Sequence, residues 1–261
     1  MKKTLSVLLT LALCLCAVSA VAETEVVVFA AASMTESLTQ IASMYREVAP
    51  DVTLTFNFDS SGTLKTQLAE GADADVFISA GQKQMNEIDA AADAAINTEG
   101  LDMVLEGTRF DLLSNTVVLV VPKGSQADIA SFDDVAGDKV ALMALGNGDV
   151  PVGQYAEQVF TWMGVWDQLK ENGKITFASN VKEVEAAAVD CGVVYISDAA
   201  TSDGVEVVAS APEGSHKPVN YPAAVLKGAA HSEEAKAFLE YLKGGECKAV
   251  FESIGFGVPD R

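Results

Sequence analysis

Serine hydroxyls follow two apolar runs of the sequence, at points where a strand should end and a helix begin. Ser33 follows the run that starts at Val26, and Ser61 follows the run that starts at Val52. The first N–H groups of a helix have no partner within it, and the helix dipole is positive there. Two such junctions in one cleft could therefore bind an anion through neutral donors.

Each serine alone also has a simpler structural explanation. Ser33 could cap a helix that begins at Met34, with Glu36 completing a capping box. The second junction is equally ambiguous, because Ser60, Ser61 and the following Thr63 could each cap the next helix. Neither serine is evidence for a binding site by itself.

Two more junctions could supply backbone donors, and a tyrosine could supply a phenol. Pro151 suits the first helical position, which leaves the N–H of Val152 as a free donor. Asn180 is a good cap and leaves the N–H of Val181 unpaired. Tyr195 ends an apolar run that we expect to be a strand, and ligands of open α/β sheets bind at the carboxyl ends of strands. The structural alternatives are ordinary helix ends and a core tyrosine.

Catalytic motifs are sparse. The two histidines, His216 and His231, have no spacing typical of a metal site. The sequence contains neither a G-x-S-x-G elbow nor a Walker phosphate loop. Its scattered carboxylates still leave a secreted α/β enzyme open as an alternative. We expect a protein that is not an enzyme.

The chain is strongly acidic. It has 17 Lys and Arg against 37 Asp and Glu, a net charge of −20. Removal of Lys2 and Lys3 with a leader would give 15 − 37 = −22. This charge argues against nucleic acid as a partner and favours a well-solvated surface, which we expect to stay away from any anion site.

The N-terminus is typical of an export signal. Residues 1–22 combine two lysines, an apolar stretch and small residues before a cleavage point, so we expect a periplasmic protein. Cys14 and Cys16 each follow a bulky leucine, which disfavours lipid anchoring. Cys191 and Cys247 then remain, and we expect two buried thiols, with one bridge as the alternative.

Strand-length apolar runs alternate with segments of helical period, which predicts an α/β protein with parallel sheets. Expected strands cover 25–30, 52–58, 75–79, 116–121, 139–144, 174–177, 192–195, 205–209 and 221–226. Expected helices cover 34–48, 63–70, 82–92, 151–163, 181–189, 232–243 and 245–254, and 97–110 is expected to be a loop. The alternation restarts after 122–124, which indicates a second lobe.

Five runs of this sequence, in order along the chain, resemble the periplasmic molybdate-binding proteins of ABC transporters. They are Val28–Ser33, Asp73–Ala80, Val150–Gly153, Gly192–Ala199 and Tyr221–Val225. The resemblance implies an α/β, two-lobed, type II substrate-binding fold with its ligand in the cleft between the lobes. It implies a first lobe at 23–121, a second at 122–212, and a return to the first at 213–261.

The resemblance also implies the ligand and its contacts. Molybdate or tungstate would be held through its oxygens, without a further cofactor, by hydroxyl, backbone and phenol donors at Ser33, Ser61, Val152, Val181 and Tyr195. The protein would act as a monomer that delivers the anion to a membrane permease. Family members often carry serine where Gly62 stands, so one hydroxyl contact is absent here.

A cavity lined only by donors would suit a fully deprotonated dianion. Protonated phosphate would leave its own O–H without an acceptor, so we expect it to be rejected. Another anion such as sulfate remains an alternative ligand on the same fold. A carboxylate ligand usually needs an arginine, and Arg46, Arg109 and Arg261 lie at none of the four junctions.

Overall fold

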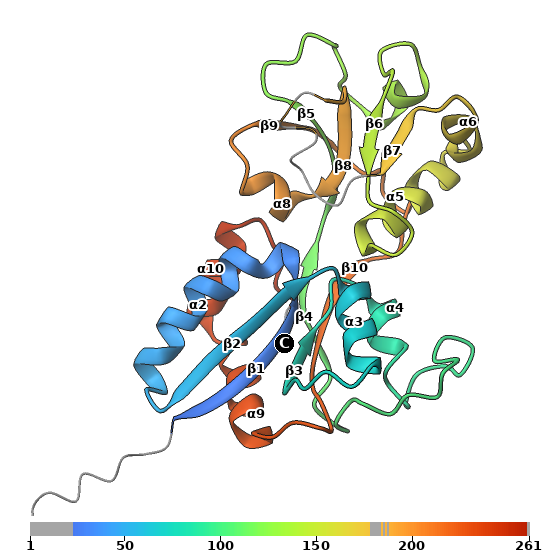
Figure 1. Ribbon diagram of the computed structural model, residues 1–261. Helices are drawn as coiled ribbons and strands as arrows, with labels where there is room; N and C mark the ends of the chain where they lie inside the picture. The colour runs from blue at the N-terminus through green and yellow to red at the C-terminus, as the bar shows by residue number, and fades with distance from the viewer. Residues whose placement is uncertain (1–22, 178–183, 185, 187, 260–261) are drawn as a thin grey trace, which may run out of the picture.

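The computed structural model describes residues 23–177, 184, 186 and 188–259, and within them two five-stranded sheets with flanking helices. The first sheet has the strand order β2-β1-β3-β10-β4, and the second has the order β7-β6-β8-β5-β9. Figure 1 shows the two sheets as separate bodies joined by extended chain between β4 and β5. The expected two-lobed α/β fold is confirmed. The leader expected at 1–22, including Cys14 and Cys16, lies outside the described residues.

The first sheet is built mainly from the N-terminal part of the chain. Its strands are β1 (Thr24–Ala31), β2 (Val52–Asp59), β3 (Val76–Ile78), β4 (Phe110–Asn115) and β10 (Val219–Val225). Its helical segments are η1 (Ala32–Met34), α2 (Thr35–Val48), α3 (Ser61–Ala69), α4 (Gln82–Asn86), α9 (Ser232–Tyr241) and α10 (Gly245–Ser253).

Both faces of the first sheet are covered, as alternation along β1 requires. Val26, Val28 and Ala30 share one buried cluster with residues of α2, α9 and α10. Phe29 belongs to the cluster on the other face, with Leu64 of α3 and residues of α4. A strand buried on both faces reads as a nearly continuous apolar run. This packing fixes where β1 ends and therefore where Ser33 lies.

The second sheet is formed by the middle of the chain. Its strands are β5 (Val117–Pro122), β6 (Met143–Leu145), β7 (Ile175–Phe177), β8 (Cys191–Tyr195) and β9 (Val205–Ser210). Its helical segments are η2 (Phe132–Ala136), α5 (Pro151–Trp162), α6 (Trp166–Glu171) and α8 (Ile196–Ala200). The expected helix at 181–189 falls largely on residues outside the described ones.

The chain crosses between the sheets twice. Thr116 alone separates β4 of the first sheet from β5 of the second, and 211–218 leads back from β9 to β10. Strand β5 therefore lies in the second sheet, whereas we expected residues up to 121 in the first lobe. Strands β5 and β10 run antiparallel to their neighbours, so the expectation of parallel sheets is wrong for them.

Several elements differ from the sequence-based expectation for local reasons. Strand β4 was not expected, because Asp111 interrupts its apolar pattern; the structure pairs that carboxylate with the side chains of Gln82 and Asn220. Helix α4 ends before 92, where Asp89 turns to pair with Arg109. The helices α6 and α8 were missed because each is very short.

The two cysteines expected in the mature chain are buried and unbonded, as predicted. Cys191 lies in β8 of the second sheet and Cys247 in α10 beside the first. Burial raises the pKa of Cys191 to about 12 and that of Cys247 to about 11, so both thiols stay protonated. Among the described residues, no helix is long and apolar enough to cross a bilayer.

Candidate anion-binding cleft

A cleft of about 500 Å³ lies between the two sheets. Its lining comes from the ends of β1, β2 and β8 and from the starts of α3, α5 and α8: Ala31, Ala32, Ser33, Phe58, Asp59, Ser60, Ser61, Ala80, Val150, Pro151, Val152, Tyr195, Asp198 and Thr201. It therefore brings together four of the five expected donor positions, Ser33, Ser61, Val152 and Tyr195. The fifth, Val181, lies outside the described residues.

Ser33 does not cap a helix. The chain makes a short 3-10 turn, η1, and the N-cap of α2 is Met34, without a side-chain capping bond. The Ser33 Oγ lies 3.0 Å from the hydroxyl of Tyr221, a buried residue of β10. The capping interpretation is therefore wrong for Ser33, whose hydroxyl is half-buried at the cleft.

Ser61 does not cap helix α3, because its neighbour Ser60 does. The Oγ of Ser60 accepts the Thr63 N–H at 3.1 Å and caps α3, which begins at Ser61. The Ser61 Oγ instead accepts the N–H of Ala80 at 2.8 Å, beyond the end of β3. An N–H group can only donate, so this bond occupies a lone pair and leaves the Ser61 hydrogen for another acceptor.

Helix α5 presents the backbone donor expected from the second sheet. Pro151 is its first residue, as predicted, and follows the extended Val150. Val152 is the second residue, so its N–H has no carbonyl partner within the helix. Both residues line the cleft, and the axis of the 12-residue helix starts there. The positive end of the α5 dipole is therefore part of the cleft wall.

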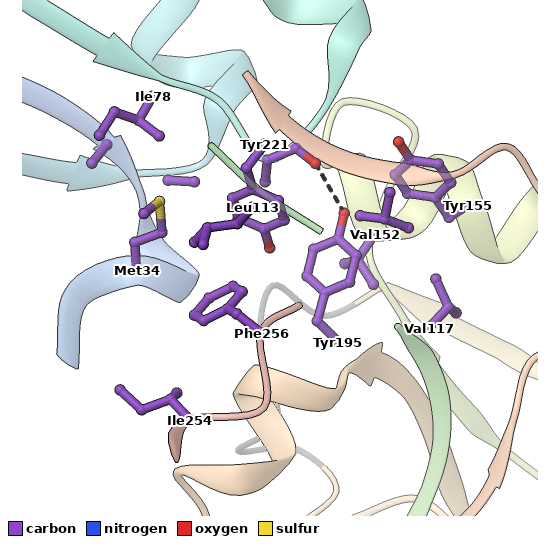
Figure 2. Close-up of a cluster of buried hydrophobic side chains, with 14 of the residues drawn as sticks. Met34, Ile78, Leu113, Val117, Val152, Tyr155, Tyr195, Tyr221, Ile254 and Phe256 are labelled. Atoms are coloured by element: carbon purple, nitrogen blue, oxygen red, sulfur yellow. Dashed lines mark hydrogen bonds between the residues drawn. The ribbon is translucent and has the colours of Figure 1, made fainter. Parts of the chain in front are cut away.

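Tyr195 is the last residue of β8 and carries its phenol into the region between the sheets (Figure 2). Its hydroxyl donates to the carbonyl oxygen of Ala80 at 3.4 Å. Its ring packs edge-on against Tyr155 and Tyr221, with centroids 6.4 and 6.0 Å away. Burial raises the Tyr195 pKa well above its usual value, so the phenol remains a donor.

Two carboxylates line the cleft, contrary to the expectation that acidic groups stay away from it. Asp59 accepts the Ser60 N–H at 2.6 Å, and Asp198 accepts the Tyr195 N–H at 3.4 Å. Each carboxylate is thus turned toward a backbone donor next to it. Burial raises the pKa of Asp198 to about 6, against the effect of that hydrogen bond. The wall is therefore not made of donors alone.

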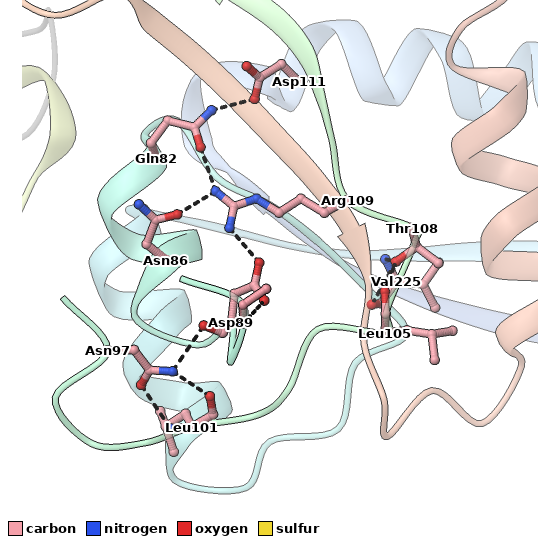
Figure 3. Close-up of polar contacts among 11 residues, drawn as sticks. Gln82, Asn86, Asp89, Asn97, Leu101, Leu105, Thr108, Arg109, Asp111 and Val225 are labelled. Carbon is pink, nitrogen blue, oxygen red and sulfur yellow. Dashed lines mark hydrogen bonds and ion pairs between the residues drawn. The ribbon is translucent and has the colours of Figure 1, made fainter. Parts of the chain in front are cut away.

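No lysine, arginine or histidine appears among the described residues that line the cleft. Arg109 does not line the cleft and is held elsewhere in the first lobe (Figure 3). Its guanidinium donates to Asp89 and Gln82 at 2.6 Å and to Asn86 at 2.5 Å. From the described lining, an anion here would meet helix and hydroxyl dipoles.

Gly62 allows the second sheet to approach the start of α3. A Cβ on Gly62 would lie 2.7 Å from the carbonyl oxygen of Asp149, in the loop before α5. A side chain at this position would therefore have to displace that carbonyl group. This close approach and the bond from Tyr195 to Ala80 join the two walls of the cleft.

Sequence reasoning missed two residues that bear on this cleft. Asp198 follows Tyr195 by three positions, which is the spacing of a capping box and could have placed its carboxylate there. Tyr221 lies in one of the recognised runs, but nothing in the sequence pairs it with Ser33, 188 positions away. Only the position of β10 in the first sheet brings these two residues together.

Comparison with known proteins agrees with this architecture. Residues 26–257 match the family described as bacterial extracellular solute-binding protein. The molybdate-binding protein ModA of Escherichia coli is 38% identical over 245 residues, 90% of each chain. ModA of Haemophilus influenzae is 36% identical over 243 residues, covering 90% of this chain and 91% of that protein.

A solved structure supports the fold. The Azotobacter vinelandii periplasmic molybdate-binding protein superposes with a TM-score of 0.76, at 22% identity, covering 90% of this chain and all of that one. At that identity the likeness concerns the fold only. The match over 26–257 establishes that this chain belongs to the bacterial extracellular solute-binding protein family.

Proposed function

We propose that this protein binds molybdate or tungstate outside the cytoplasm and delivers it to the permease of an ABC transporter. The observation that carries the proposal is the convergence of neutral donors from separate junctions on one cleft, whose described lining holds no basic side chain. The ligand itself is suggested by the molybdate-binding relatives, which match this chain over nearly its whole length.

Fixed dipoles can replace the hydration of a dianion in such a cleft. The hydroxyls of Ser33 and Ser61 and the N–H of Val152 are proposed donors, and Val181 is proposed as a further backbone donor. The phenol of Tyr195 is also proposed, and to donate to the anion its single hydrogen must turn away from the Ala80 carbonyl oxygen. Hydrogen bonds to charged groups contribute roughly 1.5–3 kcal/mol each, so several together can offset the cost of desolvation.

Anion binding should favour closure of the two lobes. Ser33 and Ser61 follow strands β1 and β2 of the first sheet, whereas Val152 lies in α5 beside the second sheet and Tyr195 ends its strand β8. A ligand that contacts both sides stabilises the form in which the sides meet. We propose that the permease recognises this closed form of a monomer, exported through a leader at 1–22 without a lipid anchor and acting without catalysis or a cofactor.

Calorimetric titration of the mature protein with molybdate, tungstate, sulfate and phosphate tests the proposal. We expect heat and an upward shift of the thermal midpoint with molybdate and tungstate. Absence of both effects for these two anions would contradict the proposed function. Binding of sulfate alone would favour the alternative, a sulfate-binding protein on the same fold. Phosphate is the most informative of the four anions, because the Asp198 carboxylate in the cleft wall could accept its proton, which removes the reason for which we expected its rejection.

A further inference from the structure

A chain of side-chain hydrogen bonds runs from Ser33 to the second sheet. The Ser33 Oγ lies 3.0 Å from the Tyr221 hydroxyl, which lies 2.9 Å from the Asn115 Nδ2. The same Nδ2 lies 2.9 Å from the Oγ of Ser197, in α8. Asn115 is the last residue of β4, directly before the chain crosses between the sheets. Residues far apart in the sequence thus meet behind the cleft.

The direction of this chain follows from one backbone group. The Thr116 N–H donates to the Asn115 Oδ1 at 2.9 Å. An N–H can only donate, so this bond identifies the oxygen of the Asn115 amide and makes the other atom the nitrogen. The two Nδ2 hydrogens then go to Tyr221 and Ser197, and the Tyr221 oxygen is an acceptor at this contact.

The phenol has a single hydrogen, and its other described partner is the Ser33 Oγ. Tyr221 is fully buried, so its hydroxyl has no access to solvent. Burial raises the pKa of Tyr221 far above its usual value and keeps that hydrogen in place. Tyr221 therefore donates to Ser33, and the Ser33 hydrogen is left for another acceptor, such as an anion in the cleft that Ser33 lines.

We propose that Tyr221 and Asn115 are positioning residues that make the Ser33 hydroxyl a donor toward the bound oxyanion. The inference rests on the proposed function, and it adds two residues that do not touch the ligand. A serine hydroxyl can donate or accept, and only donation stabilises a deprotonated anion. The hydrogen bond from Tyr221 occupies one lone pair of the Ser33 oxygen. It thereby keeps the Ser33 hydrogen from pointing at Tyr221, even before a ligand is bound.

The test is a double-mutant cycle on the affinity for molybdate. Tyr221→Phe keeps the buried ring and removes the donor, and we expect affinity to fall about five- to tenfold. In the Ser33→Ala background the same change should cost less than about twofold, because the hydroxyl that it orients is gone. Tyr45→Phe is the matched control, a buried tyrosine packed on Phe238 and Tyr241.

A general loss of packing would give a different pattern. If Tyr221→Phe weakens binding equally with and without the Ser33 hydroxyl, or leaves wild-type binding unchanged, the inference is wrong while the proposed function stands. If the wild-type protein does not bind molybdate, the proposed function fails first and the inference fails with it. Asn115→Ala gives a second cycle should Tyr221→Phe not fold, with a loss of about threefold expected only when Ser33 is present.

Discussion

The two serines of the cleft occupy similar junctions but are held in different ways. Ser61 receives a backbone N–H from Ala80, which no substitution of a side chain removes. Ser33 faces the phenol of Tyr221, and that phenol depends in turn on Asn115. One donor is thus fixed by the end of a strand, and the other by residues brought together from distant parts of the chain. Two junctions with similar sequence patterns therefore differ in how easily a substitution elsewhere in the chain can disturb their hydroxyl donor.

The largest effect should come from removing both hydroxyls. Ser33→Ala combined with Ser61→Ala should lower the affinity for molybdate by a factor of about 100 to 10,000, since two hydrogen bonds to a charged ligand are lost. Titration calorimetry with molybdate measures this loss of affinity. Ser43→Ala, an exposed serine of α2, is the control. Retention of wild-type affinity by the double variant would remove both junctions from the site.

Gly62 distinguishes the second junction from the first, and Gly62→Ala should be the next most severe change. The added Cβ would lie 2.7 Å from the Asp149 carbonyl oxygen and would hold the walls apart. Overpacking costs typically about 1–3 kcal/mol, so affinity should fall about five- to 100-fold. Gly228→Ala is the control, because its Cβ would meet open space. Equal affinities for the two variants would contradict a close approach at Gly62.

The two serines should differ in their effect on the unliganded protein. Ser61→Ala leaves the buried Ala80 N–H without its acceptor, which should lower the free energy of unfolding by about 1–2 kcal/mol. Ser33→Ala removes a half-buried hydroxyl at the cleft, where water can take its place as the acceptor of the Tyr221 O–H, and its effect should stay within about 0.5 kcal/mol. Urea denaturation of both variants measures this difference. Equal losses would mean that the two junctions are not held differently.

The smallest effect concerns the wall opposite the serines. Asp198 has its pKa raised to about 6, above the unfolded value of about 3.9, so the folded state retains its proton longer. Stability should therefore fall as pH rises from about 4 to 6, and the penalty should persist above pH 6. Asp198→Asn should remove it.

Because Asp198 is partly exposed, we expect Asp198→Asn to gain only about 1 kcal/mol at pH 7.5 and close to nothing below pH 4. Thermal melts across this pH range measure the difference. The exposed Asp203→Asn serves as the control. A gain that is the same at pH 4 and pH 7.5 would contradict the assignment to the carboxylate.

Much of the cleft could be predicted from local sequence. Ser33, Ser61, Val152 and Tyr195 were identified because strand ends and helix starts leave a local pattern, and the fold brings all four to one cleft. Which hydroxyl caps a helix was not predictable, because Ser60 and Ser61 differ only in backbone geometry. Their roles in binding stay predictions.

Contacts between residues far apart in the chain could not be predicted from the sequence. The bond from Tyr221 to Ser33 exists only because β10 lies in the first sheet, which no local pattern reports. Strand β4 was hidden by Asp111, whose carboxylate accepts hydrogen bonds from the side chains of Gln82 and Asn220. Polar partners supplied by remote segments thus explain why β4 and the contact at Ser33 were not predicted.

The place of β10 also sets an order of folding. It lies between β3 and β4, so the first sheet lacks an interior strand until residues 219–225 have been delivered. Every strand of the second sheet lies within 117–210 and can pair earlier. A chain threaded through a membrane from its N-terminus would therefore keep its leading lobe incomplete until passage is nearly over, and the part that enters first would mature last.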